Sequence, residues 1–487
     1  MFRLTPLALG LGLALQTACA QAETTLTDGA LRVEPYTFTA RNGTEVAAER
    51  GTISVPERRS DPNSRMIDIA YVRFASTSDN PGDPIIYLAG GPGGSGSGTA
   101  RGSRFPLFMA LREVADVIAF DQRGTGFSDI PPDCEDPNSP SISTPITRDN
   151  MTDYYMAETA RCWNVWESQG IDIGAYNTWE SAADIESVRV ALEADQLNLW
   201  GISYGSHLGF AYLKRYGNNV SRAVFAGSEG LDQTVKYPSS TDELFERIEV
   251  LIAADSTASQ YYPDLTEMME RVHARMEANP VEVTITPRGS DEPVTMTLGA
   301  FPVQMIAGFL IKNPESIAQL PIFYLALDNG QYERVAHIIH SQLFSGPARQ
   351  RAMPLAMDLA SGISQDRLGR VEREAQTSLL SDALNFPMPH IAGVVPEADL
   401  GEDYREPLQS DVSMLLISGD LDGRTYLGAH AEIMETLPNA TQLIVRNGGH
   451  DIYETDISVQ NVVVRYFLGE DVSGEDLELE MPAFLVP

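Results

Sequence analysis

The spacing of apolar and polar residues predicts a sheet in the first half of the chain. Residues 31–76 alternate between apolar and polar, as antiparallel strands do. Four continuous apolar runs follow, typical of strands buried on both faces, and they lie at 84–89, 114–120, 197–203 and 222–227. Residues 178–195 have helical spacing, so strands and helices alternate. The pattern predicts a mostly parallel sheet flanked by helices.

Helical spacing replaces the strand pattern from about Tyr237 onward. Ser240 and Glu243 predict a capping box at the start of the first of these helices. Strand patterns return at 412–418 and 442–445, and a helix is expected at 457–467. We therefore expect four parts in chain order, which are a signal peptide at 1–22, a first part of the α/β core at 23–235, a mainly helical cap at 236–405 and a second part of the core at 406–487.

The N-terminus has the features of a secretory signal peptide, with Arg3, an apolar centre at 4–15 and small residues at its end. Cleavage after Ala20 or Ala22 would suit these small residues. A lipid anchor at Cys19 is the less favoured alternative, because Gln16 is a poor residue three places before a lipidated cysteine. We expect export to the periplasm or the extracellular space.

Export would leave two cysteines, Cys134 and Cys162, in an oxidising compartment, where they are expected to form a disulfide. The alternative is a pair of buried free thiols.

Composition narrows the function classes. The 487 residues are 43% hydrophobic, and no apolar run beyond the N-terminus has membrane-spanning length. The net charge of -34 argues against a nucleic-acid partner, since phosphate contacts need clustered Lys and Arg. Neither a metal-ligand spacing nor a dinucleotide fingerprint occurs, so we expect no cofactor.

The candidate nucleophile is Ser203, which lies between Gly201 and Gly205 in a G-x-S-x-G motif. An expected strand precedes the motif and an expected helix follows it. In that context the glycines allow a sharp turn that projects the serine hydroxyl above the edge of the sheet.

A serine nucleophile needs a base, and the base needs an orienting acid. His450 is the candidate base, because it alone of the seven histidines lies in a glycine-containing loop directly after a late strand. Asp420 and Asp422 both follow the preceding strand. We favour Asp422, whose spacing from Gly419 and Thr425 fits a G-x-x-D-x-x-T loop. Two backbone donors, at Gly91 and Tyr204, are candidates for the oxyanion hole.

Five motifs in this order, LAGGPGGSG, DQRGTGFS, GISYGS, SGDLDGRT and GGH, resemble those of the prolyl and tripeptidyl aminopeptidase family of α/β-hydrolases. The resemblance implies an exopeptidase acting at a free N-terminus, with Ser203, Asp422 and His450 as its triad. Proline-specific members usually carry His where this chain has Ala89, which favours the exported tripeptidyl type. The resemblance also assigns Asp121 and Arg123 a structural role.

Family members bind the substrate's ammonium with carboxylates near the cap, and Glu229 is the candidate here. It lies just past the strand that follows the nucleophile helix. A solvated loop glutamate or a carboxylate that assists His450 are the alternatives. For the whole chain, the alternatives to a peptidase are an esterase or lactone hydrolase with the same triad, and a non-catalytic binding protein on this fold.

Overall fold

The computed structural model describes residues 28–136, 142–345 and 349–487. The expected signal peptide, with Cys19, lies outside these ranges. Among the residues described, none of the helices has the length and apolar character needed to cross a membrane.

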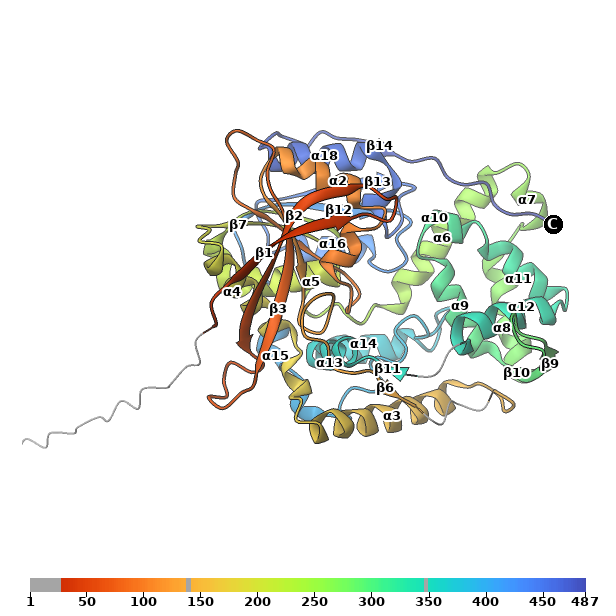
Figure 1. The fold of residues 1–487 in the computed structure, drawn as a ribbon. Helices are drawn as coiled ribbons and strands as arrows, with labels where there is room; N and C mark the ends of the chain where they lie inside the picture. Colours follow the sequence, from red (N-terminus) through yellow and green to blue (C-terminus); the bar gives the residue numbers. More distant parts are fainter. Residues whose placement is uncertain (1–27, 137–141, 346–348) are drawn as a thin grey trace, which may run out of the picture.

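A ten-stranded sheet forms the centre of the molecule (Figure 1), with strand order β1-β2-β3-β5-β4-β7-β8-β12-β13-β14. The first three strands and β5 pair antiparallel, and the strands from β5 to β14 are parallel. The predicted α/β-hydrolase fold, with its mostly parallel sheet, is confirmed. The strands are β1 (Arg32–Thr39), β2 (Glu45–Pro56), β3 (Met66–Phe74), β4 (Ile85–Leu88), β5 (Val117–Asp121), β7 (Leu197–Ser203), β8 (Val220–Ser228), β12 (Ser413–Gly419), β13 (Ala440–Arg446) and β14 (Leu477–Glu478).

Hydrophobic cores cover both faces of the sheet, which explains the continuous apolar runs. In β4, Ile86 and Leu88 belong to one core, whereas Ile85 and Tyr87 belong to the other. Helices α4 and α5 contribute to the first core, and α2 and α18 to the second. The helices of this part are α1 (Gly96–Ala100), α2 (Phe105–Ala110), α3 (Arg148–Ser168), α4 (Thr178–Ala191), α5 (Tyr204–Tyr216), α16 (Leu427–Met434), α17 (Ile452–Thr455) and α18 (Ile457–Phe467).

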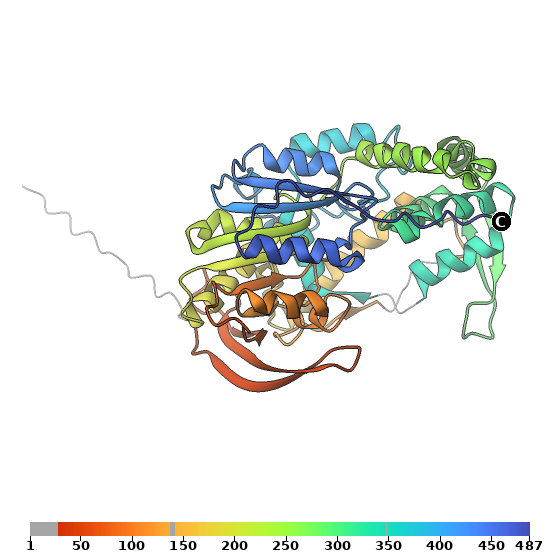
Figure 2. The same cartoon turned by 90° about the horizontal axis from the view of Figure 1, so that it is seen from above.

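Between β8 and β12 the chain forms a mainly helical region, much of which lies beside the sheet with a hydrophobic core of its own (Figures 1 and 2). Helices α13 and α14 instead pack into a core of the sheet. The helices of the region are α6 (Pro238–Ala254), α7 (Ala258–Tyr261), α8 (Leu265–Ala278), α9 (Ala300–Leu310), α10 (Pro314–Ile317), α11 (Leu320–Asp328), α12 (Tyr332–Ile339), α13 (Ala352–Ser361), α14 (Gln365–Glu374) and α15 (Glu402–Arg405).

Two details of this region differ from the sequence prediction. The prediction of a capping box at Ser240 and Glu243 is wrong, because α6 begins at Pro238 after an N-cap at Tyr237. Proline has the helical φ and lacks the N–H that would be left without a partner there, so it favours this earlier start. The region also contains an antiparallel hairpin of β9 (Val281–Ile285) and β10 (Val294–Leu298).

The C-terminal segment also packs against the helical region. The Leu485 N–H donates to the carbonyl of Ala318 over 2.9 Å, and the Tyr262 hydroxyl donates to the Leu485 carbonyl over 2.5 Å. The end of the chain therefore returns from the last sheet strand to the inserted helices, as Figure 1 shows.

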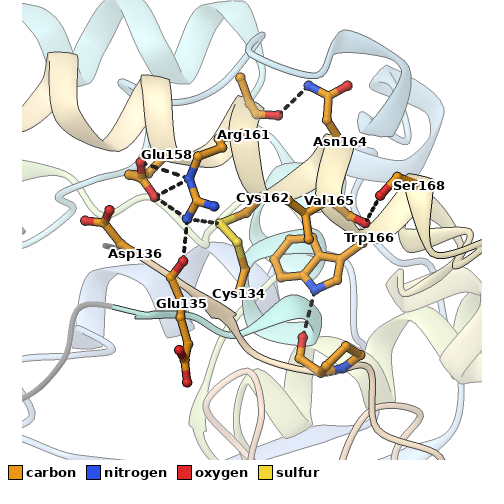
Figure 3. Close-up of a disulfide and its surroundings, with 12 residues drawn as sticks. Cys134, Glu135, Asp136, Glu158, Arg161, Cys162, Asn164, Val165, Trp166 and Ser168 are labelled. Atoms are coloured by element: carbon orange, nitrogen blue, oxygen red, sulfur yellow. Dashed lines mark hydrogen bonds and ion pairs between the residues drawn. A yellow bond between two sulfur atoms is a disulfide. The ribbon is translucent and has the colours of Figure 1, made fainter. Parts of the chain in front are cut away.

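The expected disulfide between Cys134 and Cys162 is present and buried (Figure 3). It joins β6 (Cys134–Glu135) to α3, and β6 pairs antiparallel with β11 (Arg349–Gln350). The side chain of Arg161 lies beside it and donates to the Glu135 carbonyl over 2.8 Å. The cross-link therefore anchors a short two-stranded sheet that leads directly into α13.

The first prediction concerns stability. The cysteines are 28 residues apart, and closing a loop of that size removes about 3–4 kcal/mol of chain entropy from the unfolded state. Replacing both with Ser should lower the free energy of urea unfolding by roughly that amount, and lower Tm. An unchanged unfolding midpoint would contradict the prediction.

Candidate active site

Ser203 occupies a sharp turn between β7 and α5. Its φ of 55° and ψ of -130° are rare for a residue with a side chain and mark a strained backbone. The flanking glycines are needed for space, since a Cβ at Gly205 would lie 2.0 Å from the Leu88 carbonyl oxygen and one at Gly201 would lie 2.9 Å from the Gly205 oxygen. The G-x-S-x-G pattern therefore follows from close backbone packing around the serine.

His450 and Asp422 form a hydrogen-bonded pair. His450 Nδ1 lies 2.9 Å from Asp422 Oδ2, and both side chains are buried. Asp422 follows β12 and His450 follows β13, which are adjacent parallel strands. Their carboxyl ends meet at one edge of the sheet, and the two loops bring the side chains together there.

Asp422 is held by further donors from its own loop. The N–H groups of Arg424 and Thr425 donate to Oδ1 over 2.7 and 2.9 Å, and the Thr425 hydroxyl donates to Oδ2 over 2.6 Å. Burial alone would raise the pKa of Asp422, but the attraction of His450 and these hydrogen bonds outweigh it and lower the pKa to about 2. The carboxylate is therefore charged at neutral pH.

The neighbouring carboxylate, Asp420, has a different role in the structure. Its Oδ1 accepts the N–H of Asn447 over 2.7 Å, which joins the acid loop to the histidine loop. Burial raises the pKa of Asp420.

A cavity of about 540 Å³ opens above the edge of the sheet. Four of the predicted residues line it, namely Gly91, Ser203, Glu229 and His450. Glu229 is placed there by strand register, because Ser203 pairs with Ser228. A volume of this size suits a small or extended ligand.

The two candidate oxyanion donors lie on either side of Ser203 in the chain. The Tyr204 N–H is the first of α5 and has no acceptor within the helix. Its side chain is buried, with the hydroxyl 3.0 Å from Thr178 Oγ1. Gly91 follows β4 and has a φ of 132°, which only glycine adopts readily. The next turn is supported by Arg351, whose guanidinium donates to the Gly93 carbonyl over 3.0 Å.

Glu229 does not stand alone in the cavity wall. Its Oε2 lies 2.7 Å from Nζ of Lys236, whose pKa is lowered by burial in spite of this pairing. Asp358 of α13 also lines the cavity. Burial and the charge of Glu229 raise the pKa of Asp358 to about 7, although Lys236 opposes this.

The sequence prediction missed Lys236 and Asp358. Lys236 lies seven residues after Glu229, a spacing that is not a motif. Asp358 is 129 residues away and reaches the cavity only through the packing of α13. Three more cations in the wall, Arg104, Lys312 and Arg424, were also missed.

The residues that were expected to be structural are bound within the fold. Both carboxylate oxygens of Asp121 accept hydrogen bonds from Ser97, and Arg123 forms a buried ion pair with Asp184 at 2.8 Å. A further buried group, His207 of α5 itself, has its Nδ1 3.0 Å from the carbonyl of Gly230. Within the described ranges, no group of three or more His, Cys, Asp or Glu side chains is arranged to hold a metal ion.

Two family models match the chain. One, for the alpha/beta hydrolase fold, matches residues 83–255, and one for a TAP-like protein matches residues 396–478. Between them they include the segments that carry Ser203, Glu229, Asp422 and His450.

Individual proteins with similar sequences include peptidases and a putative hydrolase. A tripeptidyl aminopeptidase of Streptomyces coelicolor is 30% identical over 190 residues, which are 36% of this chain and 34% of that protein. Serine protease Hip1 of Mycobacterium tuberculosis is 28% identical over 37% of this chain and 35% of its own length. A putative hydrolase of Escherichia coli, YuaR, is 29% identical over 84% of this chain and 82% of that protein. The chain thus matches about a third of the length of the two named peptidases. These matches confirm the resemblance that the five motifs indicated.

The second prediction uses the lowered pKa of Asp422. An aspartate in the unfolded chain has a pKa of about 3.9, so the folded state keeps this carboxylate charged to lower pH. The resulting stability, about 2–3 kcal/mol, is present above pH ~4 and lost as the pH falls toward 2. Between pH 5 and pH 2.5, the free energy of unfolding measured in urea should therefore decrease more for the wild type than for Asp422→Asn.

Asp420→Asn is the matched control. Because the pKa of Asp420 is raised in the fold, protonation of this group at low pH favours the folded state. Asp420→Asn lacks that contribution, so its free energy of unfolding should fall more between pH 5 and pH 2.5 than that of the wild type. Equal pH dependence of all three proteins would contradict the assignment of the charged acid.

Proposed function

We propose that this chain, which belongs to the α/β-hydrolases, is a serine peptidase that cleaves peptides from a free N-terminus. The observation that carries the proposal is the buried Asp422–His450 pair at a cavity lined by both a strained serine and a cluster of carboxylates. The coarser conclusion, a hydrolase with peptidase relatives, rests on the family matches alone.

In the proposed reaction, His450 Nε2 takes the proton of the Ser203 hydroxyl as its oxygen attacks the scissile carbonyl carbon. The bond between Nδ1 and Asp422 holds the ring in the tautomer that leaves Nε2 free to accept, and the charge of Asp422 stabilises the imidazolium that forms. His450 then gives the proton to the leaving amine as the C–N bond breaks. Water reverses these steps, releasing the acyl group from Ser203 as a carboxylate.

The tetrahedral intermediate carries a negative charge on the former carbonyl oxygen. The N–H groups of Gly91 and Tyr204 are the proposed donors to it. Gly91 precedes the turn that Arg351 braces, and Tyr204 begins a helix, so both donors belong to backbone that is fixed before substrate binds.

Charge balance in the cavity supports recognition of an ammonium group. Glu229 and Asp358 together carry up to two negative charges, and Lys236 carries one positive charge beside them. A substrate ammonium would restore neutrality and favour the ionised form of Asp358. An uncharged internal amide would leave the two carboxylates to repel each other, which would discriminate against chain interiors.

We also propose that the protein works outside the cytoplasm. The Cys134–Cys162 disulfide supports this, because such cross-links persist in oxidising compartments.

The third prediction concerns the triad. Ser203→Ala and His450→Ala should each lower kcat by several orders of magnitude, because the acyl-enzyme needs both groups. Asp422→Asn should be severe as well. Asp420→Asn keeps the triad and is expected to be mild. Stopped assays on an aminoacyl or tripeptidyl chromogenic amide, with circular dichroism to check folding, would measure this, and an Asp420 effect larger than that of Asp422 would show that the wrong acid was chosen.

The fourth prediction concerns the amine. Glu229→Gln keeps the size of the side chain and removes its charge. For a peptide amide with a free amino terminus, kcat/KM should fall, and the transition-state stabilisation calculated from it should weaken by about 1.5–3 kcal/mol, the range of a charge-assisted hydrogen bond. A small neutral ester, which has no ammonium, should be hydrolysed at a nearly unchanged rate.

Asp358→Asn provides the comparison within the same wall. If amine recognition is shared, both variants lose selectivity for the free amine over the N-acetylated peptide. Equal losses on peptide and ester would instead mean that Glu229 supports the fold or His450.

A further inference from the structure

The catalytic cavity has a second charged wall, in which positive groups predominate. Arg104, Lys312 and Arg424 line it together with one carboxylate, Asp451. This excess of cations occurs in a chain whose net charge is -34. A local reversal of sign at a binding site favours an anionic group on the ligand.

Two of these cations are neutralised by neighbours. Lys312 Nζ lies 2.7 Å from Asp451 Oδ2. Arg104 is buried, and its Nε lies 3.1 Å from Glu454 Oε1.

Arg424 differs from both. Across the ranges that the structure describes, its guanidinium has no hydrogen bond and no ion pair, and its contact with the ring of Phe309, at 5.7 Å from the centroid, is a cation–π contact. The backbone from which this side chain extends is held in place, because the Arg424 N–H donates to Asp422 Oδ1 over 2.7 Å. The side chain therefore starts beside the triad and reaches the cavity.

The guanidinium is only partly buried, and none of its nitrogens is among the fully buried side-chain atoms that lack a hydrogen-bonding partner. Water can therefore reach it, and a ligand carboxylate would take the place of that water. Burial lowers the pKa of Arg424, although the nearby charges of Asp422 and Asp451 oppose this, and an arginine stays charged at neutral pH. The planar group presents parallel N–H donors whose spacing matches the two oxygens of a carboxylate.

We propose that Arg424 binds a carboxylate of the peptide substrate, so that the enzyme selects short or acidic peptides. This rests on the proposed peptidase function and adds a second charged contact to the ammonium site. The carboxylate has two sources in a peptide, the C-terminus of a short chain and the side chain of Asp or Glu. A cavity of about 540 Å³ could enclose a short peptide, so that both charged ends are in reach.

Two substrate pairs distinguish the sources. The first is tetra-alanine with a free C-terminal carboxylate against its C-terminal amide. The second is a tetrapeptide amide with Glu at its last position against the same peptide amide with Gln. For the source that applies, the wild type should favour the charged member by about 10- to 100-fold in kcat/KM, as expected for a charge-assisted bidentate contact.

Arg424→Gln should reduce that ratio to near one, and Arg424→Lys, which keeps the charge without the fork, should retain part of it. The ratio within one variant is independent of how much enzyme is folded. Arg373→Gln, at an exposed arginine of α14 that does not line the cavity, removes the same charge and should leave the ratio as in the wild type. Ratios near one for both pairs in the wild type, or a ratio that survives Arg424→Gln, would overturn the proposal.

A competition assay separates this proposal from the proposed peptidase function. Hydrolysis of p-nitrophenyl acetate, which needs no peptide, is measured with tetra-alanine acid or its amide, and with the Glu or Gln peptide amide, as inhibitors. If the peptides inhibit without being cleaved, the proposed peptidase function is wrong. The carboxylate site is still supported in that case if the charged member of either pair has the lower inhibition constant and Arg424→Gln removes the difference. Equal inhibition constants within both pairs in the wild type would refute it.

Discussion

The bond between Asp422 and His450 requires two loops from different strands to end at the same place. In the register of the sheet, Gly419 of β12 lies opposite Val445 of β13. The two strands are parallel, so the residues that follow them emerge on one edge of the sheet. Asp422 comes three positions after Gly419, and His450 comes five positions after Val445. Asp420 then joins the loops through the N–H of Asn447. A shift of this register would separate Asp422 from His450.

The same edge supports groups of opposite charge within one cavity. The carboxylates of Glu229 and Asp358 lie with Lys236, and the cations Lys312 and Arg424 lie with Asp451. Each of these ions is partly removed from water. In such surroundings an unpaired charge is costly, so the charges that remain in the wall determine which ligand fits. The large negative charge of the whole chain therefore says little about the site, because surface charges are screened over about 10 Å while these groups act at contact distance.

The sequence was most informative where function depends on local backbone. The turn at Ser203 needs glycine at 201 and 205 because the Leu88 carbonyl and the next turn lie too close for a Cβ, and such a requirement appears directly as a motif. The loops of Asp422 and His450 could be found because each follows a strand with a clear apolar run. The pairing of Cys134 with Cys162 followed from the composition and the expected compartment.

Tertiary packing decided what the sequence could not. Glu229 was identified from its position after β8, but its pairing with Lys236 depends on how the chain turns before α6, where the predicted helix start was also wrong. Asp358 belongs to none of the motifs, and Arg424 lies inside the SGDLDGRT motif, where its neighbour Asp422 drew the assignment. The place of both side chains in the cavity wall is a result of tertiary packing.

Helix α13 shows how one element unites several of these features. It begins two residues after β11, whose partner β6 holds Cys134 of the disulfide. At its start, Arg351 donates to the Gly93 carbonyl, and a Cβ on Gly93 would lie 2.6 Å from the ring of Pro354. Two turns later Asp358 faces the cavity. The cross-link, the glycine loop and the acidic wall are thus parts of one packed unit, so the loop of Gly91 and Gly93 and the wall that holds Asp358 keep a fixed relation to Ser203.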